Sequence, residues 1–156
     1  MGLSNTITFQ RGTFVTRLPV SHRYSPSHGW LADAGNGRWR VGFTKFALRM
    51  LGELVDVQFE REPGGVIRPG DILGSIEGFK AVSDLYCLGR GTFVGGNSSL
   101  ASDLEVIGRD PYGAGWLYEF EGEPDTACFG VVEYRDLLAA TIDRMLAQQK
   151  PDETAG

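Results

Sequence analysis

The chain has 156 residues, of which 42% are hydrophobic, so it can form one domain with a packed core and is not a largely disordered polypeptide. Its net charge of -5 disfavours nucleic acid and anionic membranes as partners. The first part of the chain contains no continuous apolar stretch that would serve as a secretion signal or a membrane span, and the sequence therefore predicts a cytoplasmic protein.

The first elements along the chain are a weakly patterned extension and a hairpin. Polar and apolar residues alternate only weakly over residues 1–23, which indicates an N-terminal extension with one strand at most. Segments 30–32 and 39–43 are apolar and flank the sequence AGNG at residues 34–37. Asparagine and glycine are typical of tight hairpin turns, so these two segments are expected to pair as antiparallel strands.

A short helix and a half-buried strand come next. Residues 45–51 have helical spacing and are followed directly by a glycine, which is typical of a helix end. Residues 53–60 then alternate between polar and apolar side chains, which predicts a strand with one face on the core. Its expected apolar face consists of Val55, Val57 and Phe59.

The sequence predicts a second hairpin in the middle of the chain. Residues 72–77 and 81–86 are expected to be strands that are joined by the sequence GFK at residues 78–80. Residues 91–95 are expected to form another short strand. Residues 97–109 show no periodicity and are therefore expected to be irregular.

The C-terminal part contains one strand and one long helix. The strand follows a turn at residues 110–113. Residues 131–149 change to helical periodicity, with a proline shortly after them that forbids continuation. The apolar stripe of this helix consists of Tyr134, Leu138, Ile142 and Met145. We therefore expect a mainly β domain over residues 24–149, with one short internal helix and one C-terminal helix, and a disordered tail over residues 150–156.

The residues that usually carry catalysis or bind metals are scarce. His22 and His28 have no glutamate or cysteine at metal-ligand spacing, and the sequence contains neither a phosphate-binding loop nor a Gly-x-Ser-x-Gly motif. Cys87 and Cys128 have no paired spacing, so two reduced thiols in the cytoplasm are expected. The sequence thus predicts no catalytic residues and no metal site.

Lys80 stands out because it lies at the tip of a predicted hairpin. A lysine on such a turn points away from the sheet, and a modifying enzyme would be able to grip the strand on either side of it. Most surface lysines are merely solvated, so this residue by itself does not indicate a function.

Several segments in the same order resemble a known family. Residues 74–86 (GSIEGFKAVSDLY) resemble the lipoylation segment of glycine cleavage system H proteins. Further similarity to that family is found at residues 24–30, 41–44, 51–55 and 110–117. The resemblance covers about residues 24 to 145, and several separated motifs in order make it more specific than any one of them.

The resemblance implies a barrel-sandwich hybrid of two small antiparallel sheets, with the lipoyl lysine on a hairpin. It also implies that a lipoate–protein ligase attaches lipoate to Lys80 as an amide, and that the flexible arm shuttles intermediates between partner enzymes. Such a protein is a carrier subunit without an active site of its own, and a monomer suits this role. The cofactor-binding residues implied are Lys80, Glu77, Gly78, Phe79, Asp84, Ser27 and His28.

The chain departs from the family pattern close to the expected arm. The family has a glutamate between the histidine and the tryptophan of the first motif, where this chain has Gly29, while Ser27 and Asp84 remain as the other expected contacts. Residues 78–79 are Gly-Phe where the family usually has Ser-Val, and residues 87–88 are Cys-Leu where it usually has Ser-Pro. The missing carboxylate would weaken the binding of a cationic aminomethyl cargo.

These departures favour a cargo other than the aminomethyl group. The chain resembles the lipoate-binding proteins of bacterial sulfur oxidation, which are H-protein-like and work with a heterodisulfide-reductase-like complex. Our first hypothesis is therefore a carrier in sulfur oxidation, and the alternative is an H protein that works with the glycine cleavage enzymes. A biotinyl carrier is excluded, because Phe79 and Ala81 stand where methionines normally flank the lysine. Cys87 would be able to exchange with a dithiolane, although we favour a buried core residue.

Overall fold

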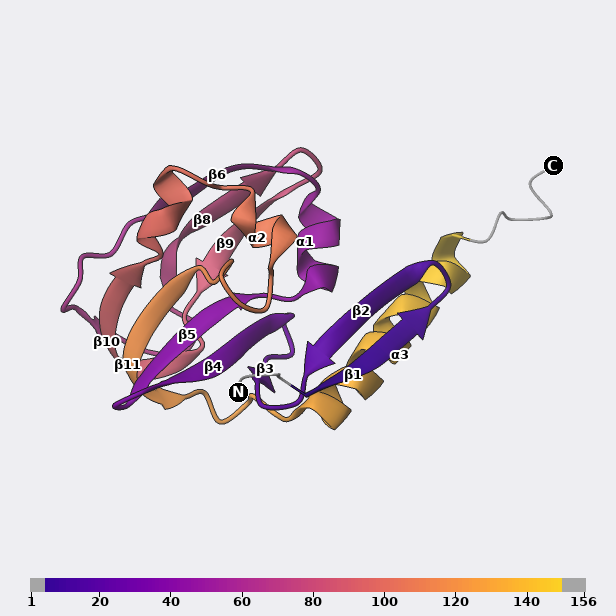
Figure 1. The fold of residues 1–156 in the computed structure, drawn as a ribbon, viewed down its shortest axis with the longest axis horizontal. Helices are drawn as coiled ribbons and strands as arrows, with labels where there is room; N and C mark the ends of the chain where they lie inside the picture. The colour runs from indigo at the N-terminus through magenta and orange to yellow at the C-terminus, as the bar shows by residue number, and fades with distance from the viewer. Residues whose placement is uncertain (1–4, 150–156) are drawn as a thin grey trace.

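The computed structural model describes residues 5–149, which form sheets of six, three and two strands and several helices (Figure 1). In the largest sheet the strand order is β3-β4-β5-β11-β10-β7, and every pair of neighbours is antiparallel. Its strands are β3 (Arg23–Tyr24), β4 (Gly29–Gly35), β5 (Arg38–Phe43), β7 (Val66–Ile67), β10 (Gly89–Gly96) and β11 (Tyr118–Pro124).

A second sheet packs on the first and completes a sandwich. It contains β6 (Leu54–Phe59), β8 (Ile72–Gly78) and β9 (Val82–Tyr86), in the order β6-β8-β9. Side chains from both sheets meet in one core, among them Ile76 and Leu85 from the smaller sheet and Phe93 and Phe120 from the larger one. The expected sandwich of two antiparallel sheets is confirmed.

The hairpin of β4 and β5 forms where the sequence predicted it. Gly35, Asn36 and Gly37 all have positive φ angles, of 87°, 56° and 75°, respectively. Glycine and asparagine tolerate this conformation better than other residues, which is why the sequence AGNG reverses the chain here.

Strand β6 differs from its prediction in the side chains that it buries. Its pairing with β8 shifts between Leu54 and Asp56, which is a β-bulge. The extra residue changes the alternation of the strand, so Val55 is 44% exposed while Leu54, Val57 and Phe59 pack on the core. The expectation that Val55 faces the core was therefore wrong, because the bulge depends on the partner strand.

Helix α1 (Lys45–Leu51) is confirmed at its predicted bounds. The hydroxyl of Thr44 caps its first turn by accepting from the N–H of Ala47, and Gly52 ends it with a φ of 79°. Leu48 and Leu51 pack into the sandwich core, whereas Phe46 on the same helix packs into a second core. The helix thus joins two cores.

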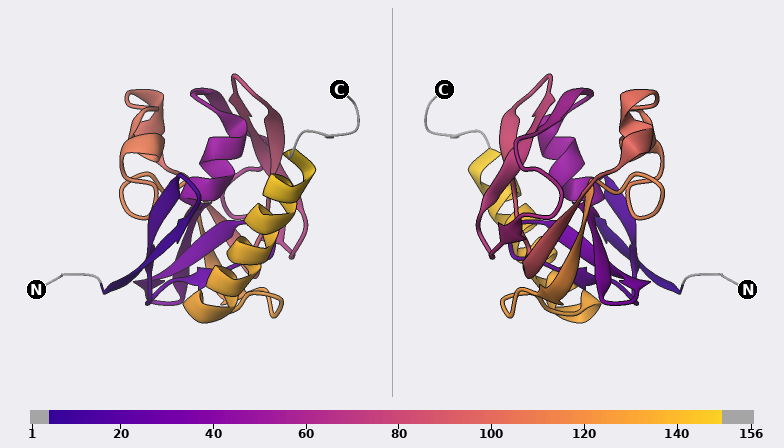
Figure 2. Two further views of the ribbon diagram at one scale, coloured as in Figure 1. Left: turned by 90° about the vertical axis from the view of Figure 1, so that its right-hand side faces the viewer. Right: turned by 90° about the vertical axis from the view of Figure 1, so that its left-hand side faces the viewer.

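The second core lies beside the sandwich and contains the N-terminal hairpin. Strands β1 (Thr6–Arg11) and β2 (Phe14–Pro19) pair with each other and lie along α3 (Val131–Gln149) (Figures 1 and 2). Its members are Phe9, Phe14, Leu18, Tyr24, Trp30, Phe46, Tyr134, Leu138 and Ile142. Helix α3 has its predicted bounds, and Tyr134, Leu138 and Ile142 of its predicted stripe are buried.

The expectation of one strand at most in residues 1–23 was wrong, because the structure has two strands there and the start of a third. The alternation of polar and apolar residues was weak because Thr16 is buried, with its hydroxyl hydrogen-bonded to that of Tyr112 at 2.9 Å, while Val15 is 39% exposed. Polar and apolar residues thus exchange their usual positions in β2. The hairpin shares a core with α3 and is an integral part of the fold.

The segment that was expected to be irregular contains two short helices. A 3-10 helix, η1 (Ser98–Ala101), is capped by the Asn97 side chain and is followed by α2 (Val106–Arg109). Helices this short give no sequence periodicity, which explains the difference. None of the helices within residues 5–149 has the length and apolar character needed to cross a membrane. The tail at residues 150–156 lies outside the described residues.

Candidate functional site

Lys80 lies in the turn between β8 and β9, and backbone hydrogen bonds hold this turn against the end of α1. The N–H of Lys80 donates to the carbonyl oxygen of Leu51 at 2.8 Å, and the N–H of Phe79 donates to that of Glu53 at 2.9 Å. Because both acceptors come from the end of the helix and the residues after it, the turn has a defined position relative to α1.

Two glycines allow this close approach. A Cβ atom on Gly78 would overlap the carbonyl oxygen of Leu51, so only glycine fits there without a shift of the backbone. Gly52 has a positive φ, and a Cβ on it would lie 2.9 Å from Cγ of Lys80. The stem of the lysine therefore runs directly over Gly52.

Exchanging Gly78 for serine, the usual family residue, should destabilise this chain. We expect Gly78→Ser to lower the free energy of unfolding by about 1–3 kcal/mol, because the added side chain has to displace the Leu51 carbonyl. Phe79→Val is the matched control, since Phe79 is 76% exposed and its replacement should change stability by only about 0.5 kcal/mol. Urea unfolding of both variants is the measurement, and equal stabilities would contradict the close contact.

The amine of Lys80 is accessible. The residue is exposed, and among residues 5–149 the structure records no hydrogen bond or ion pair for its Nζ atom. A group that has to be acylated by another enzyme must be reachable in this way, so the residue fits a covalently bound lipoyl group.

Except for the buried Gly78, the other predicted residues of this hairpin are also on the surface. Glu77 and Asp84 are exposed, and Asp56 lies across from Glu77 on the neighbouring strand. Phe79 and Val82 are 76% and 68% exposed and lie on either side of the lysine. An acidic and apolar surface therefore surrounds Lys80, as expected of a site where another protein docks.

Asp84 and Ser27 line the same pocket, although they are far apart in the sequence. Both line a small pocket of about 80 Å³ beside β9, whose apolar walls include Leu85 and Leu88. Gly29 lines the same pocket, and a Cβ on it would lie 2.7 Å from Cδ1 of Leu88. Leu88 therefore occupies the space that a side chain at position 29 would need.

His28 does not line this pocket. Its Nδ1 atom is 2.8 Å from the hydroxyl of Tyr134, and its ring lies 4.8 Å from that of Phe46. Burial lowers the pKa of His28, which favours a neutral ring that belongs to the second core. Of the predicted contacts to the arm, Ser27 and Asp84 line the small pocket, whereas the ring of His28 packs against Tyr134 and Phe46 instead.

The two cysteines are both free and buried. The thiol of Cys87 donates to the carbonyl of Gly89 at 2.9 Å, and burial raises its pKa to about 11. Burial also raises the pKa of Cys128 to about 11. Because the thiolate is the form that attacks a disulfide, neither residue is poised for exchange at neutral pH.

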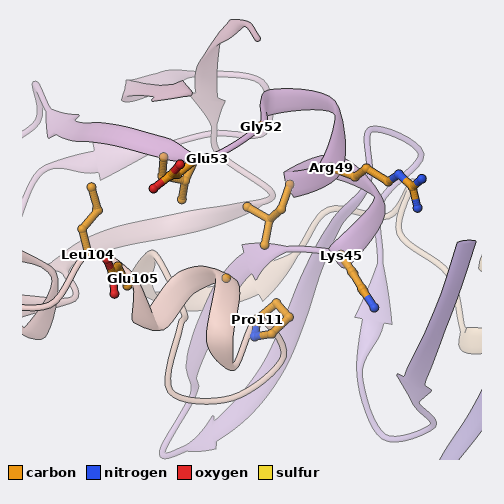
Figure 3. A pocket seen from close by; sticks show the side chains of 10 residues that line it. Lys45, Arg49, Gly52, Glu53, Leu104, Glu105 and Pro111 are labelled. Carbon is orange, nitrogen blue, oxygen red and sulfur yellow. The ribbon is translucent and has the colours of Figure 1, made fainter. Parts of the chain in front are cut away.

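A larger pocket of about 520 Å³ lies between α1 and α2 and was not predicted (Figure 3). Apolar walls come from Leu48 and Leu54 on one side and from Leu104 and Pro111 on the other, and Gly52 forms part of its rim. It exists only because residues 97–109 fold back over α1, and those residues carried no sequence signal. Within residues 5–149 no group of three His, Cys, Asp or Glu side chains is placed to hold a metal ion.

Comparisons with known proteins agree with this geometry. The family model described as "Glycine cleavage H-protein" matches residues 22–133. The glycine cleavage system H protein of Mycolicibacterium vanbaalenii is 32% identical over 122 residues, which are 78% of this chain and 92% of the relative. The H protein of Escherichia coli O45:K1 is 29% identical over 136 residues, 87% of this chain and 100% of the relative.

A solved structure shares the fold as well. The crystal structure of a glycine cleavage system H protein from Mycobacterium marinum matches with a TM-score of 0.68 and 35% identity, and it covers 76% of this chain and 97% of the other. These relatives carry the name of the glycine cleavage alternative and lend no support to the sulfur-oxidation hypothesis. The chain belongs to the glycine cleavage H-protein family, whose members are carriers with a covalently attached lipoate and no catalytic activity of their own.

Proposed function

We propose that Lys80 carries the lipoate in amide linkage and that the protein serves as the carrier between the enzymes of glycine cleavage. One observation carries this proposal: an accessible lysine amine lies on a turn that hydrogen bonds hold against the end of α1, and the strand after this turn contributes Asp84 to a pocket shared with Ser27. The names of the relatives support the choice of partners. When bound, lipoate supplies a dithiolane that accepts a cargo from one partner and delivers it to another.

The residues around Lys80 have two tasks in this proposal. The carbonyls of Leu51 and Glu53 fix the turn, so that the amine is presented to a lipoate–protein ligase at one position. The exposed Phe79 and Glu77 provide apolar and acidic contacts for the ligase and the later partners. The carrier acts as a monomer, and a cytoplasmic location agrees with its two unpaired, buried thiols.

Asp84 is proposed to stabilise a cationic aminomethyl cargo. Its carboxylate lines the pocket next to Ser27, and no side chain at position 29 supplies a second negative charge. A hydrogen bond to a charged group contributes about 1.5–3 kcal/mol, so its loss corresponds to roughly a 10- to 100-fold effect.

Asp84→Asn should accordingly lower the rate of reconstituted glycine cleavage by about 10- to 100-fold. Glu60→Gln is the control, because this exposed carboxylate follows directly after β6 and does not line the pocket, so the rate should stay close to that of the unchanged protein. Before the assay, intact-mass spectrometry must show that both proteins are fully lipoylated. Equal rates for the two variants would show that Asp84 does not hold the cargo.

A second candidate is a carrier in sulfur oxidation that works with a heterodisulfide-reductase-like complex. The observation in its favour is that Leu88 fills the space next to Gly29, so the family glutamate has no equivalent and the pocket has one negative charge fewer. The lipoylated protein should be offered to both enzyme systems. Glycine cleavage at the rate of a known H protein would reject this candidate, and sulfur oxidation without glycine cleavage would reject the first.

A further inference from the structure

The pocket between α1 and α2 is apolar inside and charged only at its edge. Leu48, Leu54, Leu104 and Pro111 are buried or half-buried in its walls. The two basic residues of its lining point away from it in Figure 3. The Nζ atom of Lys45 donates to the Val15 carbonyl at 2.8 Å, and the Arg49 guanidinium lies 5.6 Å from the Phe14 ring.

These contacts tie both cations to the N-terminal hairpin. The interior of the pocket is therefore left without a positive charge, and the exposed Glu53 and Glu105 lie at its other edge. Such an interior suits an uncharged, apolar group, because burial removes apolar surface from water without the cost of burying a charge.

One residue of the pocket lining lies next to the stem of Lys80. Gly52 forms part of the pocket, and the Cγ and Cδ atoms of Lys80 lie 2.9 Å and 3.3 Å from the place of a Cβ on Gly52. The stem therefore passes beside one residue of the pocket lining, and an arm attached to its amine starts within reach of the pocket.

The two pockets differ in size and in where their charges lie. The pocket at Asp84 measures about 80 Å³ and is lined by this one carboxylate, whereas the one between α1 and α2 measures about 520 Å³ and has Glu53 and Glu105 at its edge. The smaller pocket suits a compact cationic group. The larger one has room for an aliphatic chain that ends in a disulfide ring.

We infer that the pocket between α1 and α2 is a binding site for the uncharged lipoyl arm of Lys80, separate from the pocket at Asp84. The inference rests on the proposed function, because it requires lipoate on this lysine. The site shields the disulfide ring from solvent between partners, and it is released when a partner docks on the surface around the turn.

Amide chemical shifts locate the arm. ¹H–¹⁵N spectra of the protein without lipoate and of the lipoylated protein should differ at Gly52, Leu54, Leu104 and Gly108, and much less at Gly29. Shifts centred on Gly29 and the residues around Asp84 would overturn the inference and place the resting arm in the smaller pocket. Lipoylated protein without shifts at either place would overturn it as well.

Gly108 allows the pocket to be filled without disturbing the fold. It lines the pocket, its backbone φ is ordinary, and a Cβ on it would have no atom within 4 Å. Gly108→Phe should occupy the pocket, and Gly108→Ala is the matched control that makes the same backbone change without filling it. The measurement is the rate at which a phosphine reduces the lipoyl disulfide.

An arm that spends most of its time in the pocket is reduced in proportion to its free fraction. We expect Gly108→Phe to accelerate the reduction at least about twofold and Gly108→Ala to leave it unchanged. Equal rates in the native protein and both variants would overturn the inference. Intact-mass spectrometry distinguishes failure of the proposed function from failure of the inference. Without an adduct on Lys80 both are wrong. With the adduct, the reduction rates test the inference alone.

Discussion

Lys80→Arg is expected to abolish lipoylation and with it all carrier activity. The guanidinium of arginine stays protonated and is no substitute for an amine that has to be acylated. Because Lys80 is exposed, the free energy of unfolding should change by no more than about 0.5 kcal/mol. Intact-mass spectrometry of protein from cells that contain a lipoate–protein ligase should show the lipoyl adduct on the native chain and none on the variant.

Lys45→Arg is the matched control for this experiment. Lys45 is also an exposed lysine, at the first position of α1, and its amine donates to the carbonyl of Val15. The lipoyl adduct should be retained in full on this variant. An adduct that persists in Lys80→Arg, or one that disappears in Lys45→Arg, would show that the wrong lysine has been assigned.

Tyr134→Ala should cost about 3–5 kcal/mol of stability, the largest effect that we expect from a residue outside the turn that carries Lys80, which we call the lipoyl turn after its proposed role. The Tyr134 ring is fully buried and stacks on Tyr24 with centroids 4.7 Å apart. Its hydroxyl lies 2.8 Å from Nδ1 of His28 and 2.9 Å from Oγ1 of Thr44. Truncation therefore opens a cavity where the hairpin, α3 and the sandwich meet.

Tyr134→Phe separates the hydroxyl from the ring. It keeps the stacking on Tyr24 and leaves His28 and Thr44 each without one partner, which should cost about 1–3 kcal/mol. Urea unfolding measures both variants. A loss below about 1 kcal/mol in Tyr134→Ala would mean that the second core contributes little to stability. The fraction of lipoylated protein should stay unchanged in Tyr134→Phe, because the lipoyl turn contacts only the other end of α1.

Helix α1 connects the second core, which contains Tyr134, to the turn that carries Lys80. Phe46 at its start packs into the second core, and Leu51 at its end accepts the hydrogen bond of the lipoyl turn. Because the helix is rigid, the packing of the N-terminal hairpin and α3 against its start also helps to fix the position of the turn at its end. The N-terminal hairpin, which lies outside the family match at residues 22–133, thus supports the helix that holds Lys80.

The sequence by itself determined the elements whose signals are local. Helices at residues 45–51 and 131–149 have their predicted bounds, because periodicity, an N-cap threonine and a following glycine all act within a few residues. The hairpin at residues 34–37 and the turn at Lys80 follow from residues that favour chain reversal. Order and spacing of the motifs were sufficient to identify the family.

Only the tertiary structure decided which residues meet across these elements. The bulge that exposes Val55 depends on its register with β8, and the pocket between α1 and α2 depends on short helices without periodicity. Likewise, Leu88 occupies the space beside Gly29 because two segments that are distant in the sequence come into contact. Local propensities depend on neighbouring residues in the sequence, whereas packing brings together side chains that lie far apart in it. For this reason the sequence could single out Lys80 as the candidate for lipoylation, whereas the pockets proposed for its arm could not be predicted.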